Sequence, residues 1–207
     1  MTYYDNLPWF PQLKACTACP CRAEAQQVVP GIGLLTAAIM VLGRNPGKDE
    51  DKHGFPLIGK SGQELDVWLE KLGLDRKKLL VTNLAKCHTV SDRKPTREEI
   101  QTCGGLWLRR EFTDLPELQA VLALGAEVTQ FLLGTHATPP SKLQAYAERI
   151  TVDGKTLHVL PIAHPSYFLR AQGKKVPLYN SVLPRIREYL RRELPDAYAR
   201  SAVTVSV

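Results

Sequence analysis

The chain has 207 residues, 44% of them hydrophobic and 23% charged, and a formal net charge of +6. These values fit a compact globular domain with a substantial core, and no apolar run is long enough to cross a membrane. The positive charge favours an anionic partner such as nucleic acid without proving one. The first residues lack the basic and then apolar pattern of a secretory signal, so we expect a cytoplasmic protein without membrane contact.

Four short apolar runs predict buried strands. The first run covers residues 38–43 and ends at Gly43, and the second covers 79–83. Two more follow at 120–124 and 157–163. Apolar runs of this length are typical of parallel strands that are buried on both faces.

Segments with helical features separate these runs. Ser61 and Thr96 each precede a glutamate by three residues, a capping-box signature that predicts the start of a helix. A further helix is expected from Gly125 to about Leu133, and a final amphipathic helix over 182–193. This alternation predicts an α/β fold, a single-domain three-layer sandwich with a central, mostly parallel four-stranded sheet and helices on both faces.

The carboxyl ends of parallel strands share one edge of a sheet, and ligands bind at that edge in open α/β folds. Here Asn45, Asn83, Gly125 and His164 lie at or just beyond the four strand ends. The three polar side chains among them, Asn45, Asn83 and His164, are therefore expected to point into one crevice.

The five cysteines are an odd number in a chain without an export signal, which argues against a disulfide framework. Cys16 and Cys19 form a CxxC pair that precedes every predicted strand, unlike the usual redox motif. With the distant Cys87 and Cys103 they suit a four-thiolate site, and Cys21 is expected to lie outside it. Zinc and a cubane iron–sulfur cluster both accept four thiolates, and burial of unrelated thiols is a third possibility.

Residues 1–207 are expected to form one domain, because no repeat or low-complexity segment interrupts them. The cysteine-bearing N-terminal segment, about residues 10–30, is expected to pack on that domain. A four-thiolate site would tie it there through Cys87 and Cys103.

Six motifs follow one another along the chain. They are Cys16-x-x-Cys19, Gly43-x-x-Pro46-Gly47, Gly59-Lys60-Ser61-Gly62, Thr82-Asn83-x-x-Lys86-Cys87, Pro95-x-x-Glu98-Glu99-Ile100-x-x-Cys103 and His164-Pro165-x-x-x-Leu169-Arg170. In this order they resemble the motifs of the iron–sulfur uracil-DNA glycosylases known as family 4, over roughly residues 16–190. The resemblance implies a base-excision repair enzyme, a monofunctional DNA glycosylase. Such an enzyme flips uracil or a related damaged or modified pyrimidine out of DNA and hydrolyses its N-glycosidic bond.

The same resemblance implies one cofactor, a structural [4Fe–4S] cluster on four of the cysteines. Its ligands would be Cys16, Cys19, Cys87 and Cys103. The implied partner is DNA, either single- or double-stranded, and the protein is expected to be a monomer.

Roles in the crevice follow from the resemblance and from side-chain chemistry. The amide of Asn83 suits the O4 and N3–H edge of uracil, since it offers both a donor and an acceptor. His164 suits donation to O2 of the departing base, where negative charge develops. The expected catalytic residues are Asn45 and His164, and the expected base-binding residues are Gly43, Phe55, Leu57 and Asn83.

In the family, the loop after the active-site histidine enters the duplex and fills the gap that the flipped nucleotide leaves. An apolar wedge beside a cation fits this task, since new contacts must offset the cost of unstacking. Alternatively, Phe168 and Leu169 are core residues of a short helix. The expected DNA-binding residues are Lys60, Ser61, Tyr167, Phe168, Leu169 and Arg170.

The first active-site loop departs from the family. Family 4 usually has Glu where this chain has Arg44, and a small residue where it has Asn45. The form Gly-x-Asn-Pro-Gly resembles instead the mismatch-specific and single-strand-selective branches of the same superfamily, in which that Asn positions the attacking water. An amide can only orient water, so the acidic run 49–51 is a candidate for a nearby carboxylate, unless it is a solvated loop.

The base pocket departs as well. Leu57 stands where the family has a stacking Phe, and Phe55 lies two residues earlier. Either Phe55 swings in as the platform, or the pocket is wider and admits a base with a 5-substituent; His53 is a further candidate for its lining. Segment 87–95 lacks the insertion that carries a covalently trapping His in one relative, so covalent trapping is not expected.

Two alternatives to uracil excision remain open from the sequence. One is a DNA-lesion-binding homologue whose catalysis is weakened, which Arg44 and Leu57 motivate. The other is an enzyme for a different substrate, either a 5-substituted or hypermodified pyrimidine, which Leu57 motivates, or a free nucleotide.

Overall fold

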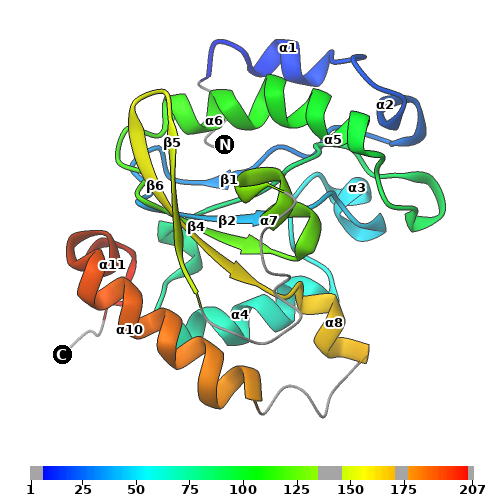
Figure 1. Ribbon diagram of the computed structural model, residues 1–207. Helices are drawn as coiled ribbons and strands as arrows, with labels where there is room; N and C mark the ends of the chain where they lie inside the picture. Colours follow the sequence, from blue (N-terminus) through cyan, green and yellow to red (C-terminus); the bar gives the residue numbers. More distant parts are fainter. Residues whose placement is uncertain (1–6, 135–145, 171–176, 205–207) are drawn as a thin grey trace.

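A six-stranded sheet lies at the centre of the computed structural model, which describes residues 7–134, 146–170 and 177–204 (Figure 1). The strands are β1 (Ile32–Gly33), β2 (Ile39–Gly43), β3 (Leu80–Asn83), β4 (Ala120–Leu124), β5 (Glu148–Val152) and β6 (Lys155–Ile162). Their order across the sheet is β1-β3-β2-β4-β6-β5. The four inner strands are parallel and coincide with the four predicted runs.

Two antiparallel edge strands make the sheet wider than the four strands predicted. β1 pairs with β3, and β5 pairs with β6. The β5–β6 hairpin turns at Asp153 and Gly154, whose φ angles are 50° and 81°, as a type I′ turn requires. The Asp-Gly pair was thus a usable hairpin signal, whereas β1 is too short to leave a pattern.

Helices cover both faces of the sheet, so the predicted α/β sandwich is confirmed. One face is covered by α1 (Phe10–Lys14), α2 (Cys21–Glu24), α5 (Arg97–Cys103), α6 (Arg109–Asp114) and α7 (Ala126–Leu133). The other face is covered by α4 (Lys60–Leu72), α8 (Pro165–Arg170), α10 (Leu183–Glu193) and α11 (Pro195–Ser201). The short helix α3 (Lys48–His53) follows β2, and short turns lie at Arg76–Lys78 and Val90–Asp92. A π-helical turn at Gly104–Leu108 joins α5 to α6, and another at Leu178–Val182 leads into α10.

Strand β2 shows how the sequence divides the core in two. Met40 and Leu42 belong to the cluster under α5 and α6, whereas Ile39 and Val41 belong to the cluster under α4 and α10. Successive side chains of a strand point to opposite faces, and all four of these are fully buried. A strand between two helical layers therefore has no polar position, which is why its sequence is a continuous apolar run.

The two predicted capping boxes had different outcomes. At the start of α5, Thr96 Oγ1 accepts from the Glu99 N–H at 3.2 Å and Glu99 accepts from the Thr96 N–H at 2.7 Å, so this box is confirmed. The box at Ser61 was wrong, because Gly59 is the N-cap of α4. Glu64 is buried and instead accepts hydrogen bonds from Trp68 Nε1 and the Tyr179 hydroxyl.

The N-terminal segment packs on the sheet and its helices from residue 7 onward. The Val29 N–H donates to the Lys86 carbonyl at 2.7 Å, and Asp51 accepts from the backbone N–H groups of Gln26 and Gln27. Leu13 is buried in the same cluster as Trp107. The assignment of residues 1–207 to one domain stays a prediction. Within the described ranges, no helix combines the length and apolar character needed to cross a membrane.

Candidate active site

The loop after β2 is fixed to the chain after β3. The Gly43 carbonyl accepts from the Leu84 N–H, and the Arg44 carbonyl accepts from the Ala85 N–H, both at 2.8 Å. This pairing continues the β2–β3 register beyond the strands. It places the 43–47 loop beside Asn83 at the carboxyl edge of the sheet, where the sequence predicted the crevice.

Asn83 lies directly opposite Gly43, and its side chain crosses the space that a larger residue would fill. A Cβ at position 43 would stand 2.3 Å from Asn83 Oδ1, so only glycine permits this approach. Asn83 is 2% exposed, and its Nδ2 has no hydrogen-bond partner among the described residues. A buried amide donor without a partner costs free energy, which is a reason to expect a ligand acceptor there.

His164 follows β6 and is held by Ser166. The Ser166 N–H donates to His164 Nδ1 at 3.2 Å, and the Ser166 Oγ lies 3.0 Å from the same atom. Burial lowers the pKa of His164 to about 4, and the charges of Arg44 and Arg170 act in the same direction, while Glu127 opposes them. The imidazole is therefore neutral at pH 7, and because Nδ1 accepts, its proton is on Nε2.

Asn45 is held from both ends of its amide. Arg44 Nε donates to Asn45 Oδ1 at 2.8 Å. Asn45 Nδ2 donates to the Pro46 carbonyl at 3.2 Å and lies 3.4 Å from Thr89 Oγ1. The carbonyl oxygen of this amide keeps a second lone pair, so it can also accept from a water molecule.

Two of the three carboxylates in the acidic run 49–51 accept hydrogen bonds from backbone N–H groups. Glu50 accepts from the Gly47 N–H at 2.8 Å, and burial raises the pKa of Glu50. Asp51 is 3% exposed and caps the N-terminal segment through Gln26. Both are structural residues, and only Asp49 is left exposed, in agreement with the solvated alternative for that position.

Glu127 of α7 brings a carboxylate to the 43–47 loop. Glu127 Oε1 lies 3.2 Å from Arg44 Nη1 and 2.7 Å from Lys94 Nζ. Burial raises the pKa of Glu127, but the hydrogen bond from Lys94 and the charges of Arg44 and Lys94 outweigh it, so the net shift is downward. Sequence reasoning missed this residue, although its place just beyond Gly125 at a strand end was a signal.

The two apolar candidates for the base pocket are placed differently. Leu57 is 3% exposed and belongs to the core cluster under α4, and its φ is 53°. Phe55 is 41% exposed. Leu57 is therefore a core residue, and Phe55 is the exposed aromatic residue of this loop. His53 is exposed and its Nδ1 lies 2.8 Å from the Asp49 carbonyl.

The expected DNA-binding residues fall into two groups. Lys60 is exposed and Ser61 half-buried at the start of α4, while Tyr167 and Leu169 are half-buried and Arg170 is exposed on α8. Phe168 is fully buried and packs edge-on against Trp68, with ring centroids 5.5 Å apart. Its expected contact with DNA is therefore corrected: Phe168 is a core residue, as the alternative held, because it anchors α8 to α4.

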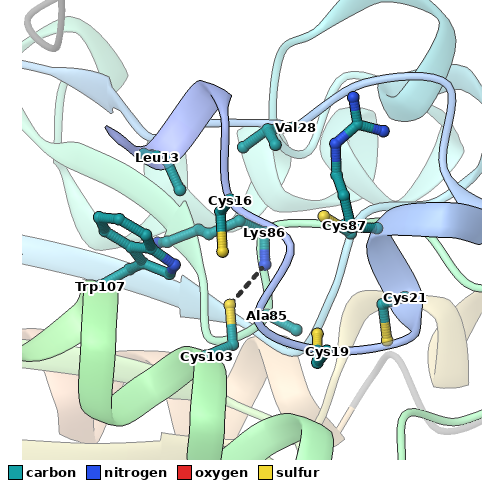
Figure 2. A pocket seen from close by; sticks show the side chains of 11 residues that line it. Leu13, Cys16, Cys19, Cys21, Val28, Ala85, Lys86, Cys87, Cys103 and Trp107 are labelled. Atoms are coloured by element: carbon teal, nitrogen blue, oxygen red, sulfur yellow. Dashed lines mark hydrogen bonds between the residues drawn. The ribbon is translucent and has the colours of Figure 1, made fainter. Parts of the chain in front are cut away.

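All five cysteines line one cavity (Figure 2). They come from the N-terminal segment, from the chain after β3 and from α5, and all are free thiols. The Lys86 N–H donates to Cys103 Sγ at 3.3 Å. Burial is the main cause that raises the pKa of Cys87 and of Cys103 to about 12. The structure thus brings the four predicted ligands together, and also Cys21, which the prediction had left outside.

A buried ion pair joins this cavity to the crevice. Lys86 Nζ donates to Glu111 Oε1 at 2.5 Å, to Thr82 Oγ1 at 2.7 Å and to the Asn83 carbonyl at 2.7 Å. Lys86 and Glu111 are at most 1% exposed. The side chain of Lys86 therefore fixes the backbone of Asn83, while the backbone N–H of Lys86 contacts Cys103.

Residues 30–194 match the family model of the uracil DNA glycosylase superfamily. The chain belongs to this superfamily. A type-4 uracil-DNA glycosylase of Thermotoga maritima is 33% identical over 80% of the chain and 83% of its own length. The type-4 enzyme of Archaeoglobus fulgidus is 30% identical over 90% of the chain and 94% of its own length.

The range matched by the superfamily model includes the residues at the predicted crevice. The matched range contains Asn45, Asn83 and His164, whereas Cys16 and Cys19 precede it. The relative from Pyrobaculum aerophilum, also a type-4 uracil-DNA glycosylase, is 29% identical over 76% of the chain and 81% of its own length. The resemblance deduced from the motifs is confirmed by these matches.

Proposed function

We propose that this protein is a monofunctional DNA glycosylase that hydrolyses the N-glycosidic bond of uracil, or of a related pyrimidine, in DNA. The observation that carries the proposal is the buried amide of Asn83, whose Nδ2 has no partner among the described residues. A buried amide with an unused donor, at the strand ends of a superfamily member, suits the O4 and N3–H edge of a flipped uracil.

His164 and Asn45 would divide the chemistry. When the C1′–N1 bond breaks, its electron pair moves to the base, and the neutral imidazole of His164 donates from Nε2 to the developing charge on O2. Asn45 Oδ1 orients a water molecule whose oxygen bonds to C1′. The water proton leaves to solvent or to the departing base, because the amide does not bind it.

The cysteine cavity would hold a [4Fe–4S] cluster on Cys16, Cys19, Cys87 and Cys103. No three Cys, His, Asp or Glu side chains in the described ranges are close enough together to hold a single metal ion, yet all five cysteines line the cavity. Four thiolates can bind either zinc or a cubane cluster. The resemblance to family 4 favours the cluster, which would supply a structural cross-link.

DNA would approach the crevice over α4 and α8. Lys60 and Ser61 lie at the start of α4, and a helix N-terminus suits a phosphate. On α8, the half-buried Tyr167 and Leu169 are the remaining wedge candidates and Arg170 is an exposed cation. We also propose that the protein is cytoplasmic and monomeric. Gel filtration of the purified chain tests the monomeric state.

The experiment is an excision panel on labelled oligonucleotides, with abasic sites cleaved by alkali. Uracil opposite guanine should be released, and Asn45→Ala should slow that release by about 10- to 1000-fold, as for a positioned catalytic group. A DNA-lesion-binding homologue would instead bind these oligonucleotides without release. If uracil, xanthine, hypoxanthine and 5-hydroxymethyluracil are all retained, the proposal fails.

Position 57 favours a second substrate class. Leu57 is buried in the core and Phe55 is exposed, so residue 57 provides no stacking ring for a base. A 5-substituted pyrimidine would then fit where a stacking ring would exclude it. Faster release of 5-hydroxymethyluracil than of uracil would favour this candidate.

A further inference from the structure

Arg44 places a cation in the active-site loop, at the position where family 4 usually has Glu. The side chain of Arg44 is 26% exposed, and two neighbours hold it. Its Nε donates to Asn45 Oδ1 at 2.8 Å, and its Nη1 donates to Glu127 Oε1 at 3.2 Å. The guanidinium is therefore fixed between the 43–47 loop and α7.

Glu127 lies beside His164 across Gly125. A Cβ at position 125 would stand 3.4 Å from the Cβ of His164 and 4.0 Å from Glu127 Oε2. Lys94 Nζ, 2.7 Å from Glu127 Oε1, completes a line of charges that runs through Glu127 and Arg44 to Asn45. This line carries two positive charges and one negative charge, so its net charge is positive.

We propose that Arg44 stabilises the departing base as a fixed cation, and that Glu127 is the positioning residue that holds it. The inference rests on the proposed function. Heterolysis of C1′–N1 leaves a positive charge on the sugar and a negative charge on the base, spread over N1, O2 and O4. A carboxylate near the sugar stabilises the first charge, whereas a fixed cation near His164 stabilises the second.

With Arg44 in place of a carboxylate, the loop would stabilise the negative charge on the departing base rather than the positive charge on the sugar. The geometry supports this, because both of its hydrogen bonds are made before substrate arrives and need no rearrangement. Its charge is felt at His164, where it helps to lower the pKa of the imidazole. Arg44 also fixes Asn45 Oδ1, so one residue affects both the water and the base.

The test compares uracil and 5-fluorouracil in the same oligonucleotide under single-turnover conditions. Fluorine withdraws electrons, so 5-fluorouracil leaves as a more stable anion and depends less on help from the protein. We expect Arg44→Met to slow uracil release by on the order of 100-fold, and 5-fluorouracil release clearly less. Arg44→Lys keeps the charge but loses the bond to Asn45, so it should slow both substrates equally.

A second readout does not depend on activity. The charged groups that act on His164 are Arg44, Glu127 and Arg170, so the pKa of His164 measured by NMR should rise in Arg44→Met and fall in Glu127→Gln. Lys77→Met removes the same charge from the exposed surface and should change neither the pKa nor the substrate ratio.

Equal losses on the two substrates in Arg44→Met, or an unchanged pKa of His164, would overturn the inference. A wild-type protein that releases neither base would instead refute the proposed function. The two failures are distinguishable, because the pKa of His164 is measured on the free protein. Circular dichroism and bound iron establish that each variant is folded.

Discussion

At the scale of single residues, Asn83 shows a conflict between stability and recognition. Its buried donor has no partner among the described residues, so the protein without ligand bears the cost. We expect Asn83→Leu, which is similar in shape, to leave the free energy of unfolding unchanged or raise it by about 1 kcal/mol. Uracil release should fall by at least about 100-fold. Thermal unfolding and single-turnover rates check the two parts, and wild-type release by this variant would contradict the assignment.

His164 gives a second prediction at this scale. Its pKa is about 4 in the folded protein and about 6.5 in a free histidine. Between these values the unfolded chain binds a proton that the folded protein does not, so stability falls as pH drops from 6.5 toward 4. His164→Gln should reduce this slope, measured by urea unfolding at several pH values. An unchanged slope would mean that the imidazole is not buried in its neutral form.

At the scale of elements, α8 is held by one side chain and presents others. Phe168 is fully buried against Trp68 of α4, whereas Leu169 is half-buried. Phe168→Ala should lower the free energy of unfolding by about 3–5 kcal/mol through the cavity it leaves. Leu169→Ala should cost less than half of that and weaken the binding of uracil-containing duplex. Urea unfolding and fluorescence anisotropy separate the two effects, and equal destabilisation would place Leu169 in the core as well.

At the scale of the whole molecule, the cysteine cavity joins segments distant in sequence. Cys103→Ser should remove the visible absorbance and bound iron of the purified protein, lower the melting temperature, and speed proteolysis within residues 7–31. Cys21→Ser is the matched control and should keep its iron, because Cys21 is not among the four proposed ligands. A colourless wild-type protein with one equivalent of zinc would contradict the cluster.

The sequence predicted the central strands and the residues at their ends, but not the details of side-chain packing. The four inner strands were visible because a strand buried on both faces is apolar throughout, as β2 is. Asn83 and His164 were found because the ends of parallel strands share one edge. What the sequence left open depended on packing. Nothing local distinguishes Phe168 from Leu169 on one helical turn, or shows that Glu64 serves Trp68 rather than the helix start.

The partners of Arg44 show the same limit. Glu127 is 83 residues away in sequence, and no periodicity connects the two. The sequence identified the unusual residue in the loop, while its counter-ion and its orientation became visible only when α7 was placed over the strand ends. The fifth cysteine is a similar case, since proximity to Cys19 in sequence did not reveal that Cys21 lines the same cavity.

Lys86 has an evolutionary consequence. Its backbone N–H contacts Cys103 Sγ, its ammonium group donates to the carbonyl of Asn83, and its charge pairs with that of the equally buried Glu111. Replacing it alone would strand a buried carboxylate, at a cost of about 3–5 kcal/mol. A homologue that had lost the cysteines would therefore still need a lysine at position 86 as long as Glu111 is present. We expect positions 86 and 111 to change only together, as one inherited unit.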